Sequence, residues 1–309
     1  MTLRIALALL VIVPAAMAYP WQSNTDYWIL GVAIAVVLIV FAWWRGLFVT
    51  TMIGRRLAVW RRNHSKPKVR PSTRATVLLL VDDPVGVGVP LSLIAGYTDR
   101  FGIRCDKVRV TSVDDGGART TWIGVTLDAA ANLAALQARS PELPLTETAE
   151  IVARRLADQL REAGLGATIV SEADAPLIEG GRETWSGVRD DAGTLSAYGV
   201  PVDDRFAERL SEVWAQPGET WTALEFSGTA TRPTVAAACA FRTDAPRKGA
   251  PLAGLVVLSG LQRPRLAALD PRSVQRIGIT PVPLPPGRLD QVRWHVESAN
   301  STLAEQTRL

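Results

Sequence analysis

Few residues in this sequence have the types and spacing that catalysis or metal binding requires. The two histidines, His64 and His295, and the two cysteines, Cys105 and Cys239, stand far apart in the chain. Catalytic Ser-His-Asp and Cys-His sets need partners that converge in space, and zinc needs several Cys and His ligands at short spacing. We therefore expect no enzyme activity, no metal and no cofactor. We expect both thiols to be buried small apolar groups in a reducing compartment.

Phosphate-binding signals are also weak. Gly86-Val87-Gly88 follows an apolar run, but no third glycine opens a helix and no Gly-Lys-Ser/Thr sequence occurs. The chain therefore has neither a dinucleotide-binding fingerprint nor a P-loop. We expect no small-molecule substrate.

Four pairs of adjacent aspartates remain, at positions 82–83, 114–115, 190–191 and 203–204. The pairs at 114–115 and 190–191 are typical of turns near glycine, and the last pair is typical of a helix cap. Asp82 and Asp83 end an apolar run and precede a proline, which also favours a turn. A carboxylate pair at a strand end could instead hold Mg²⁺ in a membrane-tethered, glycosyltransferase-like enzyme, and this is our alternative hypothesis.

The segments around these residues predict a sheet interleaved with helices. Apolar runs bounded by turn residues predict strands at 75–81, 107–113, 120–127, 167–171, 194–202, 221–227, 235–242 and 252–258. Helices are predicted at 128–138, at 146–163 with Thr146 as N-cap and Gly164 as terminator, and at 204–214. We therefore expect a mixed α/β domain over residues 75–245 and a Pro-rich extension over residues 246–309.

Two hydrophobic segments precede this domain. Residues 5–18 are apolar and include Pro14, and residues 28–41 are all apolar or glycine. We interpret them as two transmembrane helices, one in residues 1–26 with a short external turn and one in residues 27–74 with a basic extension. The first segment can also be read as a signal peptide, because Ala16-Met17-Ala18 resembles a cleavage site.

A run of positive charge follows the second segment. Its members include Arg45, Arg55, Arg56, Arg61 and Arg62, and no acidic residue occurs between Asp26 and Asp82. Basic residues beside a membrane exit mark the cytoplasmic side, and Trp43 and Trp44 are typical of the headgroup level. We therefore expect a multi-pass protein of the plasma membrane with both termini and the main domain in the cytoplasm.

The charge balance supports this interpretation. The net charge is +4, but the first 74 residues hold ten of the 34 basic residues and one of the 30 acidic ones, so the remainder carries about −5. A basic segment beside a bilayer favours contact with anionic lipid over binding of nucleic acid. The segment could continue the second helix as a stalk over residues 27–62, or it could lie on the bilayer as an interfacial helix.

Several segments resemble one family of membrane proteins. They are Trp43-Trp44-Arg45-Gly46-Leu47, Arg55-Arg56-Leu57, Asp99-Arg100-Phe101-Gly102-Ile103-Arg104, Thr120-Thr121-Trp122-Ile123-Gly124-Val125-Thr126-Leu127 and Thr220-Trp221-Thr222-Ala223-Leu224-Glu225-Phe226. In these segments the chain resembles EccE, a membrane subunit of the type VII (ESX) secretion machinery. The resemblance extends from Trp43 to about Leu258.

The resemblance implies a non-enzymatic structural subunit with two N-terminal spans and a cytoplasmic domain. It also implies a complex with EccB, EccD and the ATPase EccC, and it provides no catalytic residues. We therefore expect the chain to support assembly and stability of the export machinery, with contacts through Trp43, Trp44, Arg45, Arg55, Arg56, Arg61 and Arg62. The alternatives are the transferase based on Asp82 and Asp83 and an adaptor that binds lipid or nucleic acid through the basic segment.

Overall fold

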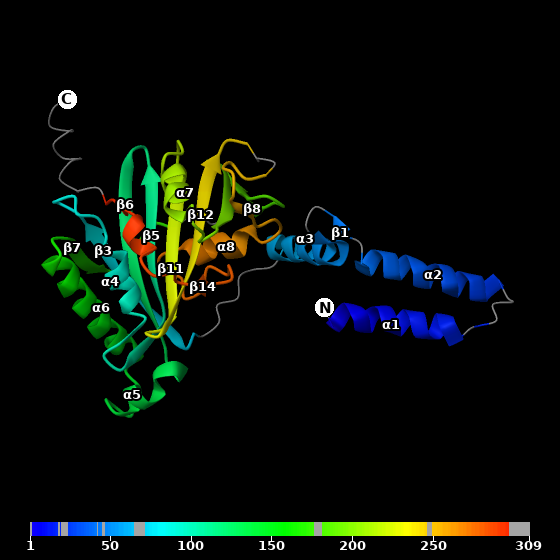
Figure 1. Ribbon diagram of the computed structural model, residues 1–309, viewed down its shortest axis with the longest axis horizontal. Coiled ribbons are helices and arrows are strands. Elements are labelled where there is room, and N and C mark those ends of the chain that lie inside the picture. Colours follow the sequence, from blue (N-terminus) through cyan, green and yellow to red (C-terminus); the bar gives the residue numbers. More distant parts are fainter. Residues whose placement is uncertain are drawn as a thin grey trace. The chain divides into compact units, whose positions relative to one another are not determined.

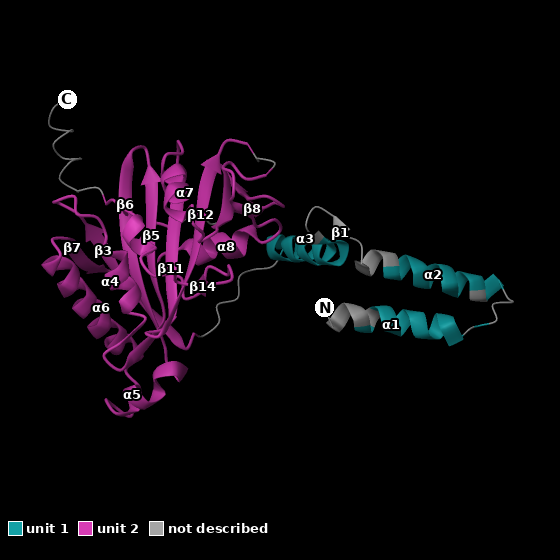
Figure 2. Ribbon diagram, in the orientation of Figure 1, with its two compact units in different colours: residues 1–66 teal, residues 67–309 magenta. Residues whose placement is uncertain are grey.

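The computed structural model describes residues 2–17, 19, 24–41, 43–44, 47–64, 72–175, 181–245 and 249–296. The chain divides into two compact units, residues 1–66 and residues 67–309 (Figure 2). Residues 249–296, from the predicted Pro-rich extension, belong to the second unit.

The first unit consists of three helices and a very short hairpin (Figure 1). Helices α1 (Thr2–Met17) and α2 (Asn24–Phe41) pack against each other, and the small side chains of Ala8, Ala15 and Ala33 are buried. Strands β1 (Trp43–Trp44) and β2 (Leu47–Phe48) pair in an antiparallel arrangement before helix α3 (Val49–His64).

Helices form in both hydrophobic segments, but their lengths differ from the expectation of two membrane-spanning helices. Helix α1 has 16 residues and α2 has 18, which correspond to about 24 and 27 Å at 1.5 Å per residue. Within the described ranges, no helix is both long and apolar enough to cross a membrane. The continuous stalk over residues 27–62 does not form either, because β1 and β2 separate α2 from α3.

The second unit is built on a large antiparallel sheet, which confirms the predicted mixed α/β class. Nine strands follow the order β7-β3-β6-β5-β11-β12-β10-β9-β8. Three further strands lie outside this order: β4 pairs with β5, β13 with β10 and β14 with β12. Seven of the eight predicted strands form: β3 (Arg74–Asp82), β5 (Ile103–Asp115), β6 (Ala118–Asp128), β7 (Gly166–Val170), β10 (Gly193–Val200), β11 (Thr220–Thr229) and β12 (Arg232–Thr243). Of the eighth, predicted at 252–258, only the two residues of β13 (Val256–Val257) are a strand. The short strands β4 (Asp99–Arg100), β8 (Arg182–Glu183), β9 (Val188–Asp190) and β14 (Val282–Pro283) were not predicted.

Helices cover both faces of this sheet. One core contains the apolar faces of α4 (Leu91–Gly96), α6 (Leu145–Glu162) and α7 (Phe206–Trp214), and a second core contains α8 (Gln262–Leu269). In the second core, the rings of Trp122 and Trp221 stack with centroids 6.2 Å apart. Short turns of helix complete the unit: η1 (Ala130–Asn132), α5 (Leu133–Gln137) and η2 (Leu289–Gln291).

Helix α6 begins one residue earlier than predicted. Pro144, not Thr146, occupies the N-cap position, and Thr148 Oγ1 donates to the Pro144 carbonyl at 2.6 Å. The predicted terminator is confirmed: Gly164 has a φ of +92° and its N–H donates to the Arg161 carbonyl at 3.0 Å. Glycine adopts this left-handed conformation without steric conflict and therefore ends the helix.

A buried polar network fixes the loop after α8 to the sheet. Arg109 and Glu225 lie opposite each other on β5 and β11, each about 1% exposed, with Arg109 Nη2 donating to Glu225 Oε2 at 2.7 Å. Arg109 also donates to the carbonyls of Ala268, Asp270 and Gln275. Burial, with a smaller effect of the Arg109 charge, lowers the pKa of Lys107 to about 6, and its amine donates to the Ser273 carbonyl at 2.6 Å.

Candidate functional site

Helix α3 carries four of the residues predicted to make contacts, and it has an amphipathic surface. Ile53, Leu57 and Trp60 are spaced four and three residues apart, which places them on one face of the helix. These side chains are 57%, 64% and 60% exposed. We call them the α3 stripe. An exposed apolar stripe of this kind is typical of a helix that is covered by lipid or by another protein.

The four arginines of α3 fall into two groups. At 3.6 residues per turn, Arg56 and Arg61 flank the α3 stripe, whereas Arg55 and Arg62 lie on the opposite face. If the α3 stripe lies on a membrane, the side chains of Arg56 and Arg61 can reach the lipid headgroups with their charged ends. The opposite pair points away from any surface that covers the stripe. Helix α3 therefore presents two arginines beside the α3 stripe and two on the opposite face.

The other predicted contact residues lie just before α3. The backbone of Trp43 pairs with Phe48 and that of Trp44 pairs with Leu47, while Arg45 lies outside the described residues. The contacts of these seven residues with lipid or other subunits stay predictions.

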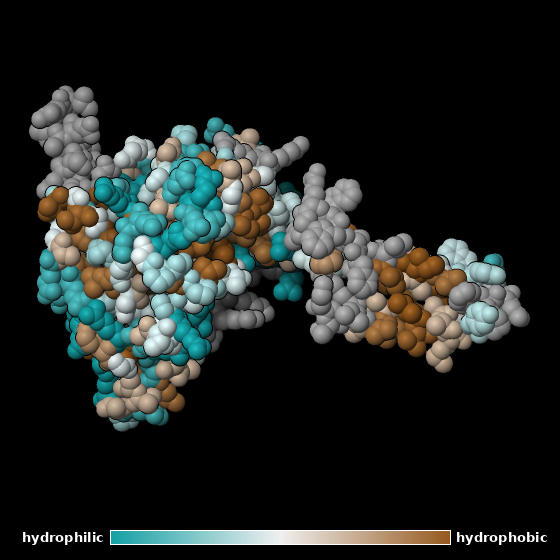
Figure 3. Space-filling view, viewed as in Figure 1, coloured by the Kyte–Doolittle hydropathy of each residue, from teal (hydrophilic) through white to brown (hydrophobic). Residues whose placement is uncertain are grey.

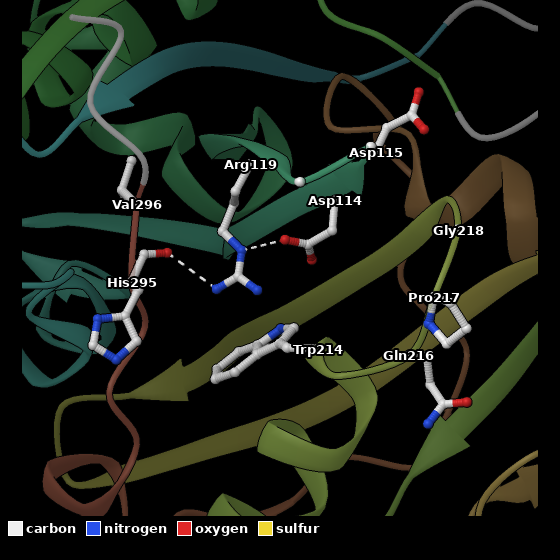
Figure 4. A pocket seen from close by; sticks show the side chains of 11 residues that line it. Asp114, Asp115, Arg119, Trp214, Gln216, Pro217, Gly218, His295 and Val296 are labelled. Carbon is white, nitrogen blue, oxygen red and sulfur yellow. Dashed lines mark hydrogen bonds and ion pairs between the residues drawn. The ribbon is translucent and has the colours of Figure 1, made fainter. Parts of the chain in front are cut away.

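A cleft in the second unit brings together residues that sequence analysis did not connect (Figure 4). Its volume is about 800 Å³, and its walls come from the β5–β6 turn, the C-terminal end of α7 and the segment around His295. Arg119 lies at the centre: its guanidinium pairs with Asp114, donates to the His295 carbonyl at 3.3 Å and lies 4.8 Å from the ring centroid of Trp214. Trp214 in turn meets Trp294 edge to face at 5.3 Å.

The chemistry of this cleft is limited. The residues that line it include no Ser, Thr, Cys or Lys, although Ser211 lines an adjoining cavity that shares Arg119, Trp214 and His295 with this cleft. Across the described part of the chain, no three His, Cys, Asp or Glu side chains gather as metal ligands. Arg119 binds the main chain of the C-terminal segment, and Trp294, which is fully buried, accepts the N–H of Val89 at 2.9 Å. Arg119 on β6 therefore attaches the main chain at His295 to the sheet, and the loop before α4 holds Trp294.

Asp83, a residue of the alternative transferase hypothesis, has a structural role. Its buried carboxylate accepts the N–H groups of Gly86, Val87 and Gly88 at 2.8, 3.1 and 2.6 Å. Gly86 and Gly88 have φ angles of +77° and +78°, which glycine adopts most readily. The backbone N–H groups of the Gly-Val-Gly loop thus bind the Asp83 carboxylate of the protein itself. This role accounts for the glycines without a bound phosphate.

Replacing Asp83 with Ala is expected to lower the free energy of unfolding by about 1–3 kcal/mol, because three hydrogen bonds to a charged acceptor are lost. Urea unfolding of the full-length protein in detergent would measure the change. The matched control is Asp115→Ala at an exposed turn, which should change stability by less than about 0.5 kcal/mol. Equal stability of the Asp83 variant and the wild type would contradict this role.

Sequence reasoning found the cysteines but missed the cleft. Cys105 and Cys239 are free and buried, as predicted. Arg119, Trp214 and His295 are far apart in the sequence, and no local motif links them. The adjacent glycines at 116 and 117, with φ of +59° and +93°, mark the tight turn that builds one wall, and together with the aspartates at 114–115 they were a local signal of this turn.

Comparison with known proteins identifies the family. The chain is 52% identical over 300 residues to the ESX-3 secretion system protein EccE3 of Mycolicibacterium smegmatis, and the alignment covers 96% of each chain. This chain belongs to the EccE family. A family model described as "Putative type VII ESX secretion system translocon, EccE" matches residues 116–200, which run from the cleft turn to the end of β10.

Other EccE proteins show how the similarity is distributed. The ESX-3 secretion system protein EccE3 of Mycobacterium tuberculosis is 46% identical over 316 residues, covering 98% of this chain and 95% of that protein. The ESX-2 secretion system protein EccE2 of the same species is 26% identical over 149 residues, covering 44% of this chain and 27% of that protein. The names of these relatives describe secretion-system proteins and mention no chemical activity.

Proposed function

We propose that this EccE chain is a structural subunit of an ESX-3 secretion complex in the plasma membrane, where it supports assembly and stability of the export machinery. The similarity to EccE3 proteins over nearly the whole length carries this proposal. Its partners are the EccB, EccC and EccD subunits, and EccC supplies ATP hydrolysis. The cleft supports a non-enzymatic role, because its central arginine binds the protein's own C-terminal segment.

Membrane attachment is assigned to the hairpin of α1 and α2. Leu9, Leu10 and Val13 on α1 and Val32 and Ile34 on α2 are exposed although apolar. Apolar side chains form much of the coloured surface of this hairpin (Figure 3). A helix that is apolar all round requires a lipid or protein environment. The hairpin inserts with both chain ends on the cytoplasmic side, where the basic residues that follow it meet the inner leaflet.

Cysteine labelling tests this topology. With Cys introduced at Ser23, which lies outside the described residues, an impermeant thiol reagent should label intact cells, whereas Cys at Ala250 should be protected. The native thiols should not interfere, because burial raises the pKa of Cys105 to about 12 and also raises that of Cys239. Protection at position 23 together with labelling at position 250 would reverse the proposed orientation.

Gene deletion tests the structural role. Without this chain, the amount of assembled complex on native gels and the export of ESX-3 substrates should fall together, because both depend on the same contacts. Asp82→Asn should restore both as well as the wild type does. An Asp82→Asn protein that assembles normally but supports no export would favour the transferase alternative.

A further inference from the structure

The turn between β4 and β5 holds an aromatic residue in an unfavourable backbone conformation. Arg100 pairs with Ile103, so Phe101 and Gly102 form a two-residue hairpin loop. Their φ angles are +57° and +71°. Such loops prefer Asn, Asp or Gly at the first position, because a left-handed conformation strains a residue with a bulky side chain. Turn geometry therefore does not explain why Phe occupies position 101.

Core packing does not explain it either. The Phe101 side chain is 52% exposed, and it belongs to neither hydrophobic core of the second unit. Local strain of this kind is common at functional sites, where the surrounding structure holds a residue in an unfavourable state. The ring packs locally against Tyr97, Arg100 and Arg155, and about half of Phe101 stays exposed to a partner.

Neighbouring side chains hold the ring between two cations. The guanidinium carbons of Arg100 and Arg155 lie 5.0 and 4.8 Å from the ring centroid of Phe101, and Tyr97 meets the ring edge to face at 6.3 Å. The Tyr97 hydroxyl and Arg100 Nη1 both donate to Gln159 Oε1, each at 2.9 Å. This frame fixes the ring before any partner binds, which reduces the entropy lost on binding.

Carboxylates lie near the cations beside the ring, because Asp158 and Glu162 act on Tyr97 together with Arg100 and Arg155. Within the described ranges, neither Arg100 nor Arg155 forms an ion pair, whereas the nearby Arg154 pairs with Glu150 and Arg161 pairs with Asp158. Asp99, which precedes Arg100, accepts the N–H of Ala230 at 3.2 Å. An aromatic side chain flanked by arginines has the composition of an interaction hot spot, and it is complementary to a surface that carries carboxylates.

We propose that Phe101, Arg100 and Arg155 form a docking site for a carboxylate-bearing surface of another protein subunit. The partner places an apolar side chain against the Phe101 ring and Asp or Glu side chains against the two guanidinium groups. This inference rests on the proposed function, because the partner belongs to the same membrane complex. All three residues of the site belong to the second unit.

Phe101→Asn in the full-length chain tests the proposal, because Asn is favoured in this turn but lacks the ring. We expect a thermal unfolding temperature close to that of the wild type, because relief of turn strain offsets the lost ring contacts with Tyr97, Arg100 and Arg155. The amount of the chain in the high-mass complex on native gels should fall at least tenfold. An Arg100→Gln/Arg155→Gln double variant should show a loss in the same direction.

Leu143→Asn is the matched control. Leu143 is the other described non-glycine residue with a positive φ, +52°, and its side chain is also exposed. Helix α6 starts two residues later, and Arg155 is about 15 Å along that helix from its first residue. The control should therefore relieve similar strain and leave assembly unchanged.

Photo-crosslinking identifies what covers the ring. p-Benzoylphenylalanine at position 101 should crosslink to one polypeptide, at a peptide that contains Asp or Glu. Products with lipid only, or no products, would overturn the proposal, and so would normal assembly of Phe101→Asn.

If Phe101→Asn is less stable than the wild type and loses assembly while no crosslink forms, the ring is structural and the proposal is wrong. If the wild type itself enters no high-mass complex, the proposed function fails, and the crosslink alone decides the docking site.

Discussion

Arg109→Met is expected to lower the free energy of unfolding by about 3–5 kcal/mol, the largest stability effect that we predict for a single substitution. The substitution leaves the Glu225 carboxylate buried without its cationic partner at 2.7 Å. It also removes the donor that fixes the carbonyls of Ala268, Asp270 and Gln275, so the loop after α8 loses its main attachment to β5. Glu225 still accepts the N–H of Ile277 at 3.1 Å, which does not neutralise its charge.

Near-UV circular dichroism during urea unfolding should report this change, since Trp122 and Trp221 stack in the same core. The control is Arg154→Met, which removes an exposed i,i+4 ion pair with Glu150 and should cost about 0.5 kcal/mol or less. A double variant, Arg109→Met/Glu225→Leu, should recover part of the lost stability, because no buried charge remains. Equal stabilities of the Arg109 and Arg154 variants would show that the buried pair does not fix the loop.

Reversing Arg55, Arg56, Arg61 and Arg62 to Glu is expected to leave the chain in the membrane fraction and to abolish most co-purification with EccC and EccD. The proposed hydrophobic insertion of the α1–α2 hairpin would exceed what a basic patch adds, so anchoring should survive. Contacts with acidic partner surfaces depend on the positive charge of these arginines. Such charge complementarity determines which partner binds, and in which orientation, more than it determines the affinity. Arg45 stays unchanged in this variant so that orientation is preserved.

The matching control replaces the same four arginines with Lys, which keeps the charge and should largely keep assembly. One double variant separates the faces of α3: Arg55→Glu/Arg62→Glu should reduce co-purification even if lipid covers the α3 stripe, because these residues lie opposite it. If the quadruple Glu variant assembles and supports export normally, the helix contacts lipid only.

Sequence patterns were sufficient for the sheet because its central strands are long. Continuous apolar runs such as that of β3 placed seven of the predicted strands, and only the two residues of β13 form in the eighth. Strands of two or three residues, such as β4 and β8, carry too few residues to show a period. They form because neighbouring strands offer free backbone groups, which only the assembled fold reveals.

Contacts between distant residues could not be predicted. Arg109 and Glu225 are 116 residues apart, and as single charges in apolar strands they gave no sign of pairing. Arg119 and His295 are 176 residues apart. The sequence left open whether the second helix continues through Leu47 and Phe48, and the structure has a separate helix α3 after them. The Asp-Arg-Phe-Gly segment drew attention through family resemblance, but only the structure showed that its ring is exposed.

Gentle-detergent purification of the tagged full-length chain from its native membranes, followed by mass spectrometry of the high-mass fraction, tests the central claim most directly. The account predicts that EccB, EccC and EccD of an ESX-3 system co-purify with the chain. Recovery of the chain alone, under conditions in which those three subunits still purify together from the same extract, would contradict it.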